Sequence, residues 1–460
     1  MAKRKNALRL VSLLVAVALI LAACGGGKGA NNQSTSTNNG SSTGSSTTTG
    51  SGSGGTAEQP PKEVSFTIGF ATGDPAGKKA IEDVIDAFTA AYPHIKVVNV
   101  SDSAASVSYL DWLKTKEAVG EFPDLVEMRD TKVFVEAGKL AELPEDLHSL
   151  FAFLPQFEGK YYNAPLAGTA PIGIIYSKKA YADAGITELP KTYEEFLEIQ
   201  EKLKQSGISP IVVGGKDIWH MGFWVNYFLI NEVYSEDPDW NSKRNRGEAS
   251  FTDENVVQAI SDYKELFQKY VDKGWLSTAD NQTASFLVTG KAAQLYSGPW
   301  MFAQIQEADP NFEFGFYAIP DREGDVNVVG LPTLSGWSFS AEAAKDPDKL
   351  EAMKTFIRFF YDPEIYRETL KKNNSIPITA ADASYEAGEQ MQEVLRLIAD
   401  PSVTKSLMFN QWYGENAIPP QFRNWFYKHL QELVVNDGDV VTYMKKADEQ
   451  YDNDLKANQQ

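Results

Sequence analysis

The sequence predicts an α/β fold with enough chain for two domains, and three observations support this prediction. Residues 64–70 alternate apolar with small or polar side chains, as a strand does, and residues 81–88 place apolar side chains on one face of a helix. Residues 95–100 then form a second strand pattern. A strand, a helix and a strand at this spacing form a βαβ unit, which implies a parallel sheet.

The same alternation of elements recurs along the rest of the chain. Residues 172–176 predict a strand, the capping-box sequence Thr192–Glu195 begins a helix, and residues 210–213 predict the next strand. Asp346–Pro347 begins another helix, because proline is tolerated in the first helical turn. From about residue 421 the pattern is mainly helical.

The first 23 residues have the features of a signal peptide. Four basic residues precede an apolar run, Leu10–Ala23, that is too short to span a hydrocarbon core of about 20 residues. The run ends in Leu21-Ala22-Ala23-Cys24, which is similar to the lipobox of bacterial lipoproteins. Cys24 is also the only cysteine of the chain, so we expect its sulfur to be lipidated and the leader to be removed. The alternative is an ordinary secreted protein that is cleaved after Ala23.

Residues 24–62 are predicted to be a flexible tether. Nearly all residues from 25 to 56 are Gly, Ser, Thr or Asn, which cannot bury enough apolar surface to fold. The predicted globular body begins at residue 63, so a lipid on Cys24 would hold it near the membrane on the extracellular side. This arrangement suits a Gram-positive cell, which has no outer membrane to retain a freely diffusing protein.

The composition excludes several classes of function. The net charge of −19 argues against binding of nucleic acid or of an anionic membrane surface. The four histidines are too scattered for a zinc motif, and we expect no metal and no cofactor. The segment Gly73–Lys79 has too few residues between its glycines for a phosphate-binding loop. No G-x-S-x-G nucleophile elbow is present in the predicted globular body.

Several sequence blocks together resemble the extracellular solute-binding family that includes the maltose-binding and multiple-sugar-binding proteins of ABC importers. They occur in the family's order and span nearly the whole body. The blocks are EFPDL at 121–125, GIIYS at 173–177, AGI at 184–186 followed by LPKTYEEF at 189–196, GKAA at 290–293 followed by GPWM at 298–301, and AIP at 318–320.

This resemblance implies a two-lobe periplasmic-binding-protein-like fold of type II, in which each lobe is a mostly parallel sheet flanked by helices. Lobe 1 would comprise residues 63–168 and 333–388, and lobe 2 residues 169–332 and 389–460. The ligand would lie in the cleft at the hinge. The implied function is capture of a sugar by cleft closure and its delivery to the transmembrane subunits of an ABC permease, by a monomer that is not an enzyme.

The resemblance and the positions of loops after strands also indicate ligand-binding residues. Aromatic faces cover the apolar patches of a sugar, while charged and amide groups pair with its hydroxyls, which are costly to bury unpaired. The candidates are Trp300, which matches a ligand-stacking tryptophan of the family, and Asp74, Arg129, Asp130, Asp217, Trp219, Trp337, Trp412 and Trp425. For Trp300 the alternative is a packing role in the core, and for Asp74, Arg129 and Asp130 the alternative is a solvated turn.

Two alternatives concern the ligand and the function. The chain departs from the maltose-binding pattern at Thr169-Ala170, where an acidic ligand residue is expected, which argues against maltose itself. A secreted carbohydrate-active enzyme with two carboxylates distant in sequence, or a sensor-coupled sugar binder, is the alternative function.

Overall fold

The computed structural model describes residues 62–102 and 108–457, all of which belong to a single compact unit that begins at Pro60. Cys24 and the predicted tether therefore lie outside the described residues. In the described ranges, no helix combines the length and the apolar character needed to cross a membrane.

The first sheet contains the βαβ unit that the sequence predicts. It has the order β2-β1-β3-β9 and consists of β1 (Val64–Gly69), β2 (Ile95–Asn99), β3 (Leu125–Met128) and β9 (Gly336–Phe339). Strands β2 and β3 pair in parallel with β1, whereas β9 pairs antiparallel with β3. The sheet is thus mixed, with three strands in one direction and one opposed.

Helices complete the first body, the name used here for this sheet and its helices. The apolar stripe of α1 is buried, including Ile81, Val84 and Phe88, as the helical period predicts. The helices are α1 (Pro75–Ala91), α2 (Tyr109–Ala118), α3 (Thr131–Glu136), α11 (Pro347–Phe360) and α12 (Pro363–Lys372), with 3-10 turns at Glu145–Leu150 and Ala343–Lys345. Helix α11 begins at the predicted position because Asp346 caps it.

The second sheet has the order β5-β6-β4-β7 and is also mixed. Strand β4 runs antiparallel to both neighbours, and β5 pairs in parallel with β6. The strands are β4 (Gly173–Ser177), β5 (Ser209–Val212), β6 (Ala292–Ser297) and β7 (Phe314–Tyr317), beside a two-stranded ribbon of β8 (Asn327–Val329) and β10 (Thr404–Ser406). The predicted strands at 172–176 and 210–213 are confirmed within one residue.

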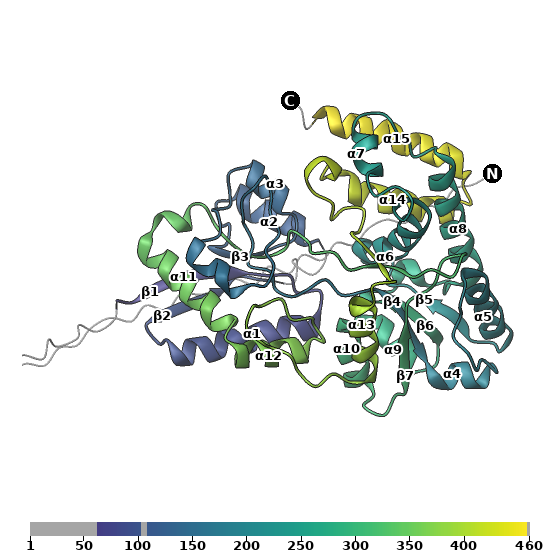
Figure 1. The fold of residues 1–460 in the computed structure, drawn as a ribbon, viewed down its shortest axis with the longest axis horizontal. Coiled ribbons are helices and arrows are strands. Elements are labelled where there is room, and N and C mark those ends of the chain that lie inside the picture. The colour runs from purple at the N-terminus through teal and green to yellow at the C-terminus, as the bar shows by residue number, and fades with distance from the viewer. Residues whose placement is uncertain (1–61, 103–107, 458–460) are drawn as a thin grey trace, which may run out of the picture. The chain divides into compact units, whose positions relative to one another are not determined.

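This sheet and its helices form the second body (Figure 1). Thr192 caps α5 as the sequence predicts, by accepting a hydrogen bond from the Glu195 N–H. The helices are α4 (Lys178–Asp183), α5 (Tyr193–Gln205), α6 (Ile218–Leu229), α7 (Trp240–Asn245), α8 (Glu254–Tyr270), α9 (Asp280–Val288), α10 (Trp300–Ala308), α13 (Glu389–Ala399), α14 (Phe422–Val435) and α15 (Val440–Ala457), with a π-turn at Ile230–Tyr234 and 3-10 turns at Trp275–Ser277 and Gly414–Asn416.

Each body has its own hydrophobic core. The first sheet packs against one cluster that includes Phe66 and Phe356 and another that includes Val126. The second sheet packs against two further clusters, one on each side. The chain passes from the first body to the second before β4, returns with β9, and crosses again before α13. The residue-level lobe boundaries stay predictions.

Candidate functional site

A cavity of about 490 Å³ is lined by residues of both bodies and of the segments that connect them. The first body contributes the loop after β3 and the start of α3, and the connecting segments contribute residues 166–170 and 333–336. The second body contributes the starts of α6 and α10 and the loop at 408–413. Because parallel strands present their following loops at one edge of a sheet, this is where an α/β fold binds ligands.

Aromatic side chains of the second body form one wall of the cavity. The rings of Trp219 and Phe223 lie 5.6 Å apart, and the rings of Phe223 and Trp300 lie 5.7 Å apart. Trp412 and Tyr413 add two more rings from the 408–413 loop. Aromatic faces of this kind can cover the C–H faces of a ligand at a low cost in side-chain entropy.

Trp300 is held by its own backbone. It is the first residue of α10, and its indole packs directly on Gly298, where an added Cβ would lie 1.9 Å from Cζ3 of the indole. A glycine is therefore needed at position 298, because the side chain of any other residue would collide with the indole ring.

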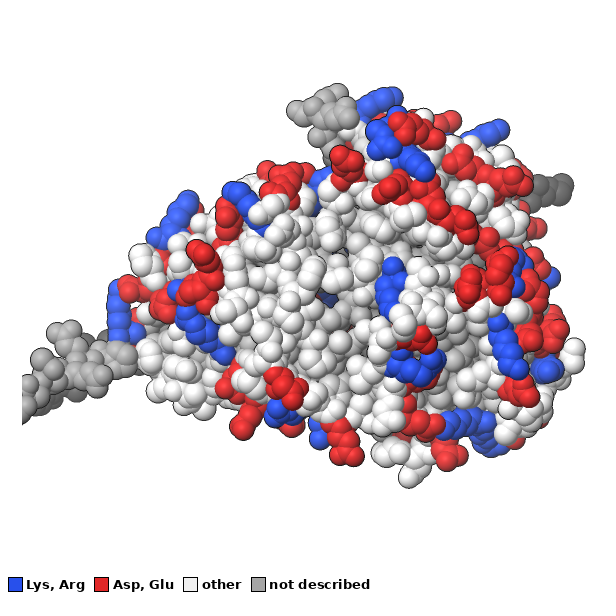
Figure 2. Space-filling model, viewed as in Figure 1, with Lys and Arg blue, Asp and Glu red and all other residues white. Residues whose placement is uncertain are grey.

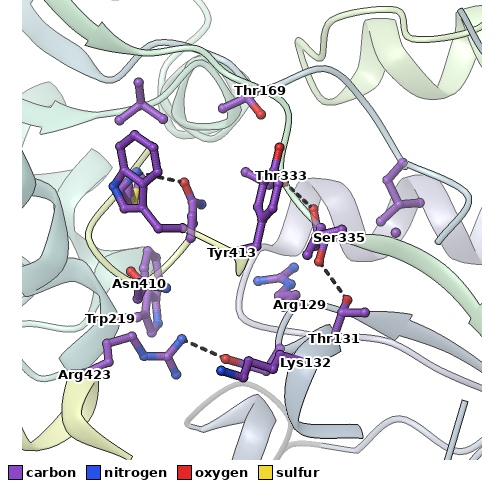
Figure 3. A pocket seen from close by; sticks show the side chains of 18 of the residues that line it. Arg129, Thr131, Lys132, Thr169, Trp219, Thr333, Ser335, Asn410, Tyr413 and Arg423 are labelled. Carbon is purple, nitrogen blue, oxygen red and sulfur yellow. Dashed lines mark hydrogen bonds and ion pairs between the residues drawn. The ribbon is translucent and has the colours of Figure 1, made fainter. Parts of the chain in front are cut away.

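Charged groups from both bodies line the cavity next to Trp219 and Tyr413 (Figure 3). The carboxylate of Glu127 is buried, and it accepts hydrogen bonds from the Ala71 N–H at 2.9 Å and from Arg129 Nε at 2.7 Å. Asp130 of the first body pairs with Arg423 of α14 in the second body, with 3.3 Å between Oδ1 and Nη1. This ion pair connects the two bodies at the cavity.

Hydroxyl groups complete the lining on the side of the connecting segments. The Thr131 hydroxyl donates to the Leu334 carbonyl at 2.8 Å, and the hydroxyls of Thr333 and Ser335 lie 2.7 Å apart. The lining thus combines aromatic faces, cations, carboxylates and hydroxyls, which is the set of groups that a polyhydroxylated ligand needs.

A match to known proteins agrees with this geometry. Residues 72–366 match the family of bacterial extracellular solute-binding proteins. The chain belongs to this family. These proteins bind solutes for ABC transport and are not enzymes, so the alternative of a carbohydrate-active enzyme is dropped.

Three similar proteins illustrate the relationship. A multiple sugar-binding protein of Streptococcus mutans is 23% identical over 322 residues, which cover 65% of this chain and 73% of that protein. The diacetylchitobiose binding protein of Streptomyces coelicolor is 26% identical over 302 residues, or 62% of this chain and 67% of that protein. A solved chitin oligosaccharide binding protein has a TM-score of 0.74 at 24% identity, covering 85% of this chain and 99% of that one. The likeness to that solved structure shows the fold.

Five of the nine ligand-binding candidates of this solute-binding protein line the cavity. They are Trp300, Trp219, Trp412, Arg129 and Asp130. Their contact with a ligand stays a prediction. Trp300 also packs against two hydrophobic clusters. Its ring therefore has one part in the cavity lining and another part in core packing.

Two carboxylates among the candidates have hydrogen-bond partners within the protein and lie outside the lining of this cavity. Asp74 caps α1, accepting from the N–H groups of Ala76 and Gly77, and it lines a smaller neighbouring pocket of about 130 Å³. Burial raises the pKa of Asp74. Asp217 accepts a hydrogen bond from the Asp280 N–H at 2.7 Å and does not line the cavity.

The two remaining tryptophan candidates lie away from the cavity. Trp337 is fully buried in the core of the first body, where its ring meets those of Phe70 and Phe360 edge-on. It sits there because Phe356 and Phe360 of α11 pack on its ring, so it does not line the cavity. Trp425 stacks on His429 at 4.5 Å on α14, outside the cavity.

The cavity also contains residues that the sequence did not indicate. The most notable are Lys132, Arg423, Asn410 and Tyr413. Tyr413 is adjacent to the predicted Trp412, so the aromatic pair was a usable signal. Nothing local in the sequence connects Arg423 with Asp130, which lies 293 positions earlier. Within residues 62–102 and 108–457 no cluster of His, Cys, Asp and Glu could hold a metal ion.

Proposed function

We propose that this solute-binding protein captures an oligosaccharide in the cavity between its two bodies and delivers it to an ABC permease. The observation that carries the proposal is the composition of this cavity, in which the rings of Trp219, Trp300 and Trp412 accompany charged and hydroxyl groups. The volume of about 490 Å³ falls within the range of roughly 300–1,000 Å³ that is usual for small-ligand pockets. Sugar ligands in the names of the relatives support the same ligand class.

Closure of the two bodies is the step that would report binding to the permease. Two contacts support a cleft that closes: the Asp130–Arg423 ion pair, and the hydrogen bond from Gln304 of α10 to Asp74 at 3.3 Å. A ligand that touches both bodies favours the closed form by its difference in affinity for the two forms. The lobes of this proposal are residues 63–168 with 333–388, and residues 169–332 with 389–460.

The proposed location is the outer face of the cell membrane. Cys24 would carry the lipid, and residues 25–62 would connect it to the body. Two acyl chains on one residue hold a protein stably, whereas a single chain does so only marginally. The protein would act as a monomer, and its partners are the sugar and the transmembrane subunits of the permease.

A thermal-shift screen against oligosaccharides of different composition and length tests the ligand class. A ligand at 100 times its Kd adds about 2.7 kcal/mol to the unfolding free energy, which raises the melting temperature by several degrees. Hits are then titrated by calorimetry. If a broad carbohydrate panel gives no shift while a polar non-sugar solute does, the proposed ligand class is wrong.

A further inference from the structure

The charge balance of the cavity is the reverse of that of the whole protein. The sequence has 62 Asp and Glu against 43 Lys and Arg. The cavity is lined by three cationic side chains, Arg129, Lys132 and Arg423, and by two carboxylates, Glu127 and Asp130. Figure 2 shows that acidic and basic groups are mixed around the outer surface, with a wide uncharged area between the two bodies. A local excess of cations in an acidic protein calls for a specific explanation.

Internal pairing leaves part of this positive charge available. Arg129 directs Nε and Nη2 to the same oxygen of Glu127, at 2.7 and 2.6 Å. Arg423 uses Nε on Asn424 and Nη1 on Asp130. Among the described residues, the nearest ion-pair partner of Lys132 is Glu136, at 3.8 Å. Each guanidinium therefore keeps donors beyond those used in its own pair, and the Lys132 ammonium is the least neutralised of the three.

The three cations converge from both bodies. Arg129 and Lys132 follow β3 in the first body, and Arg423 extends from α14 in the second. In Figure 3 they lie on the same side of the cavity, next to Trp219 and Tyr413. An anionic group at this place would be attracted by both bodies at once, so charge recognition and closure would reinforce each other.

We propose that the ligand is an acidic oligosaccharide with a hexuronate unit, whose carboxylate lies among Arg129, Lys132 and Arg423. This inference rests on the proposed function. A guanidinium offers paired donors that match the planar carboxylate, and Lys132 adds a compact positive charge. The aromatic wall takes the faces of the sugar rings at the same time. A sulfate or phosphate ester shares the anionic chemistry, and the test separates these sources.

The experiment is calorimetric titration of the protein with matched sugars. The panel contains galacturonate, glucuronate and mannuronate oligosaccharides, neutral oligosaccharides of the same length, and sulfated and phosphorylated sugars. We expect a uronate member to bind about 10- to 100-fold more tightly than its neutral counterpart, as for hydrogen bonds to charged groups. Its affinity should also fall as the salt concentration rises.

Two variants locate the effect. Lys132→Gln should weaken uronate binding about 10-fold and reduce its salt dependence, and Arg423→Gln should act in the same direction. Lys179→Gln is the control, because Lys179 pairs with Asp183 on the exposed side of α4 and its loss changes the net charge equally. The control should bind the uronate like the wild type.

The outcomes separate this inference from the proposed function. Neutral sugars that bind as tightly as every acidic one overturn the inference and leave the proposed function intact. If no carbohydrate binds, the proposed function fails as well. Preference for a sulfated or phosphorylated sugar over all uronates overturns the carboxylate assignment. A uronate preference that survives in both cavity variants shows that the anion lies elsewhere.

Discussion

Replacing Trp300 by alanine removes one aromatic face of the proposed binding surface. The change should lower both the affinity for the ligand and the stability of the fold, and the two effects can be measured separately. The indole lines the cavity, so its loss should weaken oligosaccharide binding by about 1–3 kcal/mol, or roughly 5- to 150-fold, taking aromatic stacking on a planar ligand as a guide. The indole is only partly buried, so the unfolding free energy should fall by about 2 kcal/mol. A fully buried tryptophan such as Trp337 should instead cost about 3–5 kcal/mol.

The assay is calorimetric titration, together with denaturant unfolding of the ligand-free variant. Trp425→Ala is the matched control, because Trp425 is also a partly buried tryptophan that packs against the core of the second body but lies outside the cavity. It should lose a similar amount of stability and keep its affinity. An unchanged affinity of Trp300→Ala, or an equal loss in the control, would refute the assignment of this ring to the ligand.

Gly298→Ala offers a milder version of the same test. The added Cβ would lie 1.9 Å from the indole of Trp300, so the ring must move while its surface is retained. We expect a loss of affinity without the full loss of packing. A variant that binds normally would mean that the position of the ring is unimportant for recognition.

Two further predictions concern pH and membrane attachment. Burial raises the pKa of Asp280 to about 8 in the folded protein, against 3.8 for its ordinary value, so between pH 6.5 and 8 the folded protein holds a proton that the unfolded chain has released. The unfolding free energy should therefore fall by about 1–2 kcal/mol from pH 6.5 to pH 8. Burial lowers the pKa of His220 to about 3, so near pH 8 this histidine is neutral in both the folded and the unfolded protein. Asp280→Asn should flatten this decline in denaturant unfolding measured at both pH values; an identical slope in the variant would refute the role of Asp280. Cys24→Ser should release the protein from the membrane fraction with ligand binding intact, and a variant that stays in that fraction would contradict the lipobox assignment.

Local sequence patterns predicted most of the fold elements. Alternation located β1, and the sequence Asp346–Pro347 located the start of α11, because these signals act within one element. The same Asp-Pro signal occurs at Asp74–Pro75, where Asp74 caps α1. The helix-start rule therefore predicts this capping role of Asp74, whereas its contact with a ligand stays a prediction.

The composition of the site was less predictable because it depends on contacts between distant segments. Trp300 and Trp219 were indicated by the resemblance to the family and by their positions after predicted strands. The burial of Trp337 depends on which helix covers β9, and periodicity carries no information on this. Likewise, Arg423 reaches the cavity only because α14 lies beside the loop that contains Asp130, and this pairing has no local signature.

Solution scattering with and without the best sugar of the panel tests the central claim most directly. If an oligosaccharide is held between the two bodies, saturation should decrease the radius of gyration of residues 60–460, because the ligand favours the closed form. The measurement is made at a concentration where calorimetry shows full occupancy. An unchanged radius of gyration at full occupancy would contradict capture by closure of the cleft.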